Sequence, residues 1–136
     1  MSVEDRSSSI NMVTLLLVSN NRDFISALSD YSEKAEIYRV NTGKEALFMI
    51  ADKAINLVIS DESLEDMSGL EFAEKLISKN PMVHCAVVNS LSSKDYHEAS
   101  EGLGLMTPLP VQPEKRHIEQ LLLQVNKIIQ MTGSHN

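Results

Sequence analysis

The chain has 136 residues, a length that suits one domain, and it is 43% hydrophobic and 23% charged, unlike disordered proteins. Its formal charge of −7 excludes broad electrostatic attraction to nucleic acid or to an anionic membrane. The single Cys85 excludes an internal disulfide, and the polar residues 1–11 contain no secretory signal. We therefore expect a cytoplasmic protein that binds neither membranes nor nucleic acid directly.

Short apolar segments alternate along the chain with segments of helical period. This pattern is typical of a parallel sheet covered by helices on both faces. Most of the apolar segments lack the alternation of half-buried strands, as expected where both faces of a strand are buried. The predicted strands are residues 14–18, 36–40, 57–60, 83–88 and 105–107.

Apolar residues three and four positions apart predict a helix after each strand. The helix predicted at residues 92–101 has only Tyr96 and Ala99 as an apolar face, so we expect it to be the least firmly anchored. The other helical stripes are Phe24, Ile25 and Leu28; Leu47, Ile50 and Ala51; Leu70, Ala73, Leu76 and Ile77; and Ile118, Leu121, Leu122, Val125 and Ile128.

Five strand and helix pairs predict a single α/β domain, a (βα)5 flavodoxin-like fold with a parallel five-stranded sheet in the order 2-1-3-4-5. We expect it to span residues 13–131, between flexible tails at residues 1–12 and 132–136. The binding crevice of this fold lies beyond the carboxyl ends of strands 1 and 3, which here lead into Ser19 and Asp61. Asp61 is therefore a candidate reactive or ligand-binding carboxylate. The alternative is that Asp61 only ends its strand and bonds its own loop.

Several stretches together resemble a response-regulator receiver domain of two-component signalling. They are residues 15–18, 41–47, 56–61 and 67–72, with Pro110 before the last helix, and the match runs from about residue 14 to residue 129. The resemblance implies that Asp61 is the phospho-accepting aspartate, which takes a phosphoryl group from a histidine kinase with a bound magnesium ion. It also implies a cis Leu109–Pro110 bond.

The other positions of the family's site are substituted in this chain. The magnesium-binding acidic pair is matched by Ser19 and Asn20, and the phosphoryl-binding Thr or Ser is matched by Asn89, which Ser90 follows. The phosphoryl-binding lysine is matched by Leu109, and the aromatic switch residue is matched by Met106. We assign no cofactor and expect Mg²⁺ to bind weakly at most, because Asp61 is then the one matched carboxylate.

Neighbouring residues offer a partial replacement for the lost ligands. The candidates around Asp61 are the Ser63 backbone and Glu62, the best substitute because it adjoins Asp61. The alternative for Glu62, Glu65 and Asp66 is a solvated acidic loop. Asp23 is interpreted as the first-turn acid of a helix capped by Asn20.

These substitutions predict a degenerate receiver, or pseudo-receiver, that is not an enzyme and acts by protein–protein interaction. The resemblance implies a histidine kinase, an output protein or another regulator as partner. It also implies a homodimer through the face of helix 4, strand 5 and helix 5, where ordinary core packing is the alternative for Met106, Leu109 and Val111. Two other functions stay open: a working phospho-accepting receiver at Asp61 with weak magnesium, and a small-ligand-sensing module on the same fold.

Overall fold

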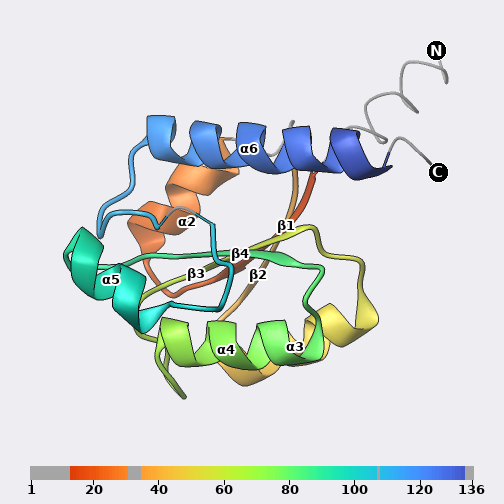
Figure 1. Ribbon diagram of the computed structural model, residues 1–136. Helices are drawn as coiled ribbons and strands as arrows, with labels where there is room; N and C mark the ends of the chain where they lie inside the picture. The colour runs from red at the N-terminus through yellow and green to blue at the C-terminus, as the bar shows by residue number, and fades with distance from the viewer. Residues whose placement is uncertain (1–12, 31–34, 107, 134–136) are drawn as a thin grey trace, which may run out of the picture.

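The computed structural model describes residues 13–30, 35–106 and 108–133 (Figure 1). The predicted tail at residues 1–12 lies outside the described residues, as do residues 134–136 of the predicted C-terminal tail. The described elements are β1 (Val13–Val18), α2 (Arg22–Ser29), β2 (Ala35–Val40), α3 (Gly43–Asp52), β3 (Leu57–Ser60), α4 (Gly69–Lys79), β4 (His84–Val87), α5 (Ser93–Ala99) and α6 (Lys115–Gly133).

The strands form a parallel sheet in the order β2-β1-β3-β4. In Figure 1, α2 and α6 lie above the sheet, α3 and α4 lie below it, and α5 lies at its left-hand side. This arrangement confirms the predicted flavodoxin-like α/β fold. No helix among the described residues combines the length and apolarity that a membrane span requires.

The sheet separates two apolar cores because successive side chains of a strand point to opposite faces. On β1, Leu15 and Leu17 belong to the core beneath α2 and α6, whereas Leu16 and Val18 belong to the core that α3 and α4 cover. All four side chains are at most 1% exposed. Burial on both faces explains why this strand is an uninterrupted apolar run in the sequence.

The fifth strand differs from the prediction, because Leu105 and Met106 belong to no regular strand, while residue 107 of the predicted strand lies outside the described residues. The segment still lies beside β4: Met106 N donates to Cys85 O at 2.8 Å, and Leu109 N donates to Val87 O at 3.1 Å. Pro108 lies between these two contacts and has no N–H to donate, so the ladder is interrupted. The fifth position of the sheet is thus occupied by an irregular segment with one parallel bridge, Val88 to Leu109.

The Leu109–Pro110 bond is trans, as is every peptide bond of the described residues, so the cis expectation is wrong. Leu109 pairs with the end of β4 and the chain just beyond it, since its N–H donates to Val87 O and its carbonyl accepts from Asn89 N at 2.9 Å. The resemblance implied a cis bond after a phosphoryl-binding lysine, and Leu109 stands at the position of that lysine in this chain.

The helix starts are set by polar side chains that accept free backbone N–H groups. The cap of α2 is Asn21, which accepts from Asp23 N and Phe24 N, and not the predicted Asn20. The Asn20 side chain instead donates from its Nδ2 to Glu65 Oε2 at 3.1 Å. Asp23 lies in the first turn of α2, as predicted.

Candidate functional site

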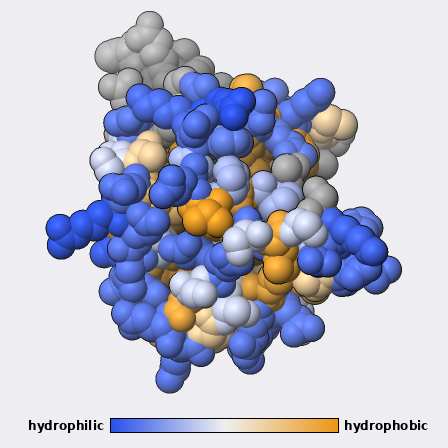
Figure 2. All heavy atoms as spheres, turned by 90° about the vertical axis from the view of Figure 1, so that its left-hand side faces the viewer, coloured by the Kyte–Doolittle hydropathy of each residue, from blue (hydrophilic) through white to orange (hydrophobic). Residues whose placement is uncertain are grey.

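Polar side chains gather where β1, β3 and β4 end. Val18 and Ser60 are register partners at the carboxyl ends of β1 and β3, so the next residues, Ser19 and Asp61, emerge side by side. Figure 2 looks onto the side of the molecule where α5 lies, and shows a largely hydrophilic surface with a few apolar patches. The register therefore places the predicted candidates together at one edge of the sheet.

Asp61 is held by two neutral donors. Its Oδ2 accepts from the Ser19 hydroxyl at 2.8 Å, and its Oδ1 accepts from Glu62 N at 3.1 Å. Ser19 is 1% exposed, and its Oγ also accepts from Asn21 N at 3.0 Å. Because a hydroxyl has one hydrogen, the bond from Asn21 leaves that hydrogen directed at Asp61.

The neighbouring acids do not converge on Asp61. Glu62 Oε2 accepts from Ser90 N at 3.0 Å and from Ser90 Oγ at 2.7 Å, and Glu65 Oε2 accepts from Asn20 Nδ2 at 3.1 Å. Among residues 13–30, 35–106 and 108–133, no three Asp, Glu, His or Cys side chains form a group able to hold a metal ion. Magnesium is usually held by one or two carboxylates together with waters and phosphate oxygens, so Asp61 alone offers it few protein ligands.

Two further predicted positions contribute backbone structure rather than ligands. Ser63 forms an antiparallel bridge with Ser68, which closes the loop after β3. Asn89 Oδ1 accepts from Leu91 N at 2.7 Å, while its buried Nδ2 has no hydrogen-bond partner. The amide of Asn89 therefore shapes the loop after β4.

Leu109 and Met106 do not reach the crevice. Leu109 is 4% and Met106 is 8% exposed, and both belong to the apolar core that α6 covers. Core packing, the alternative for these two residues, therefore holds, while Val111 is 51% exposed. No lysine or arginine of the described chain forms an ion pair with Asp61.

Two contacts near the site have no signal in the sequence. Asp66 accepts from Gly43 N at 2.9 Å and from Lys44 N at 3.0 Å, and these bonds, that from Gly43 foremost, lower the pKa of its carboxyl. Arg39 Nη1 donates to Ser19 O at 3.1 Å. In both cases the partners are about twenty residues apart, a separation at which no local pattern links them.

Cys85 is a core residue, as its apolar strand predicts. It is 2% exposed, and burial raises the pKa of its thiol to about 12. A thiol that stays protonated is a poor nucleophile, so this residue contributes packing alone.

No protein-family model matches the chain, and no curated protein matches it. Solved structures do. The signal receiver domain of an HD domain-containing protein from Pseudomonas fluorescens Pf-5 has a TM-score of 0.78 at 15% identity, over 93% of this chain and 95% of that one. The chemotaxis response regulator CheY4 of Vibrio cholerae has a TM-score of 0.74 at 19% identity, over 84% of this chain and 98% of that one. The BeF3-activated DrrB receiver domain has a TM-score of 0.69 at 18% identity, over 88% of this chain and 98% of that one. The chain therefore has the fold of response-regulator receiver domains.

Proposed function

We propose that this chain is an atypical receiver domain that transmits a signal by binding other proteins, with impaired magnesium-dependent phosphorylation of Asp61. The observation that carries the proposal is the neutral surroundings of Asp61. Its carboxylate is bonded by the Ser19 hydroxyl and the Glu62 N–H, and no described cationic side chain pairs with it.

The charge balance explains why such a site phosphorylates poorly. A phosphoryl group would bring a charge of about −2 to Asp61. Each missing cation at about 4 Å removes about 4 kcal/mol of attraction at an effective dielectric of about 20. Leu109 cannot supply that charge, since it is packed in the core where the resemblance expects a lysine. Phosphotransfer slowed by orders of magnitude follows, because stabilising the developing charge is usually the largest catalytic contribution.

The same proposal covers the class of protein and its partners. The chain is inferred to be a non-catalytic, cytoplasmic module whose partners are proteins: a histidine kinase, an output protein or another regulator. The supporting observations are the receiver fold, the net charge of −7 and the absence of converging metal ligands among the described residues. A surface of this charge disfavours direct binding to nucleic acid.

The experiment is a backbone NMR titration with Mg²⁺ and then with Mg²⁺ and beryllium fluoride, a phosphoryl mimic. The proposal expects no saturable shifts of the amides after β1, β3 and β4 at millimolar magnesium. Asp61→Asn is the matched control, since it removes the acceptor while preserving shape. Saturable shifts in the natural chain that vanish in Asp61→Asn would overturn the impaired-site proposal.

A working receiver at Asp61 is the second candidate, and one observation favours it. The Asp61 side chain is only half-buried at the end of β3, so a kinase or small phosphodonor reaches it without unfolding the crevice. Incubation with acetyl phosphate and Mg²⁺ separates the two candidates by intact mass. A gain of one phosphoryl group in the natural chain and none in Asp61→Asn supports the working receiver.

A further inference from the structure

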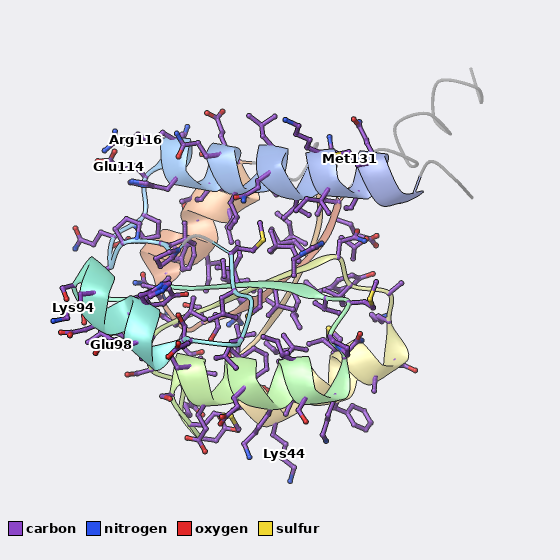
Figure 3. All side chains as sticks on the ribbon, in the orientation of Figure 1. Lys44, Lys94, Glu98, Glu114, Arg116 and Met131 are labelled. Carbon is purple, nitrogen blue, oxygen red and sulfur yellow. The ribbon has the colours of Figure 1, made fainter. Side chains whose placement is uncertain are left out.

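Helix α5 is weakly attached to the rest of the molecule. Of its side chains that the structure describes, only that of Tyr96 is buried, and the others are exposed. Figure 3 shows Lys94 and Glu98 on the outer side of this helix. The ion pairs found among the described residues involve α6 and its neighbours, not α5. The position of α5 therefore depends on the segments at its two ends.

The segment that follows α5 contains two glycines in the left-handed conformation. Gly102 has a φ of 84° and Gly104 has a φ of 67°. A Cβ at either position would meet nothing within 4 Å beyond the adjacent residues, so no other part of the described chain packs closely there. Glycine also restricts its own backbone least of all residues. The end of α5 is therefore held loosely by the chain that leaves it.

The segment that precedes α5 is held by hydrogen bonds to other parts of the chain. Asn89 N donates to Leu109 O at 2.9 Å, so the chain still pairs within the sheet at this residue. Ser90 comes next, and its N–H and its hydroxyl both donate to Glu62 Oε2, at 3.0 Å and 2.7 Å. Ser92, two residues further on, is the N-cap of α5. Glu62 thus fixes the direction in which the chain leaves the sheet for α5.

We propose that Glu62 is a built-in clamp that sets the position of α5 without a phosphoryl group or a metal ion. Hydrogen bonds to a carboxylate are roughly twice as strong as those between neutral groups. Both bonds end on Ser90, so they restrain its backbone and its side chain together. Neither bond involves the Asp61 carboxylate, which is bonded by the Ser19 hydroxyl and by Glu62 N.

The clamp controls the shape of a hollow beside α5. The hollow has a volume of about 890 Å³, with Tyr96 and His97 of α5 on one side and Leu105 and Met106 of the irregular fifth segment on the other. The position of α5 therefore sets the distance between the two sides. The use of the clamp rests on the function proposed above, in which partners bind without phosphorylation. The existence of the clamp does not rest on that function.

Amide hydrogen exchange followed by NMR, without magnesium or a phosphodonor, tests the clamp. The reporters are Tyr96 N and Ser100 N, whose bonds to Ser92 O and Tyr96 O form only while α5 is intact. Glu62→Ala removes both bonds to Ser90, so exchange of the two reporters should accelerate at least about tenfold. Amides of β1, read in the same spectra, should exchange as in the natural chain, because the sheet is unaffected.

Glu65→Ala is the matched control. It removes the same charge from the same loop, but the partner of Glu65 is Asn20 and not Ser90, so the reporters should change by less than about twofold. Glu62→Gln keeps the shape and one acceptor oxygen, and should give an acceleration between those of the natural chain and Glu62→Ala. Unchanged exchange of the reporters in Glu62→Ala, or equal acceleration in Glu65→Ala, overturns the proposal.

Asp61→Asn separates the clamp from the crevice carboxylate. Asparagine keeps an oxygen that accepts from Glu62 N, so exchange of the α5 reporters should stay within about twofold of the natural chain. Acceleration as large as in Glu62→Ala would mean that Asp61 holds α5, and the clamp would be rejected. The magnesium and beryllium fluoride titration decides the impaired phosphorylation by itself, so either idea can fail while the other stands.

Discussion

Ser90 Oγ lies 2.7 Å from Glu62 Oε2, and Ser90 N lies 3.0 Å from the same oxygen. These two bonds join the loop after β4 to the loop after β3. Glu62 is thereby committed to Ser90, although the sequence makes it the best substitute ligand beside Asp61. A carboxylate that accepts two such bonds restrains the Ser90 loop without any added ion.

Replacing Ser90 with alanine should loosen the loop after β4. A hydrogen bond to a charged acceptor at an exposed site is worth about 1 kcal/mol, so exchange of the backbone amides at position 90 and at Leu91 should accelerate about fivefold. Hydrogen exchange followed by NMR measures the change. Ser78→Ala, at an exposed position of α4, serves as control. Unchanged exchange in Ser90→Ala would show that the hydroxyl bond to Glu62 does not restrain the loop.

Tyr96→Phe should stabilise the fold. Tyr96 is 8% exposed, its hydroxyl has no hydrogen-bond partner, and burial raises the pKa of its phenol to about 12. Removing an unpaired buried hydroxyl should increase the free energy of unfolding by about 1 kcal/mol. Urea denaturation measures the gain. The control is Tyr38→Phe, whose hydroxyl donates to Glu36 at 2.7 Å and should bring no gain.

Gly69→Ala should destabilise the chain more than Gly43→Ala. Both glycines begin a helix, but a Cβ at Gly69 would lie 2.3 Å from the Asp61 carbonyl oxygen, which is rigid backbone. A Cβ at Gly43 would lie 2.7 Å from the Met67 sulfur, near the end of a flexible side chain. We expect a loss of about 1–3 kcal/mol at Gly69 and a smaller one at Gly43. Denaturation midpoints of the two variants decide the point, and equal losses would count against this packing.

Stability should fall in acid partly through Asp66. Its pKa is lowered in the folded chain by the bonds from Gly43 N and Lys44 N, so the carboxylate stabilises the fold above its unfolded pKa of 3.8. That contribution is lost as the pH falls through the lower, folded pKa. Asp66→Asn should therefore be less stable than the natural chain at about pH 6, with the difference shrinking toward about pH 3. A difference that does not depend on pH would rule out the ionised carboxylate as its cause.

The sequence by itself determined the layered fold. Buried parallel strands are uninterrupted apolar runs, and covering helices carry stripes of period 3.6, so β1 and α6 follow from local composition. The sequence also placed Asp61 beyond β3, because the crevice position depends on strand order alone. Its cap assignment at Asn20 was wrong by one residue, since Asn20 and Asn21 are adjacent residues of the same type and the sequence does not distinguish between them as caps.

The tertiary structure alone decided which polar groups meet. Ser19 and Asp61 are 42 residues apart, and only the register of β1 with β3 brings them to 2.8 Å. Glu62 with Ser90 depends in the same way on the packing of two separate loops. Leu109 is a further example, because its position in the sequence matched a crevice lysine. Its apolar side chain packs instead in the core beneath α6. Local patterns encode burial and period, but contacts between distant residues arise when the sheet assembles.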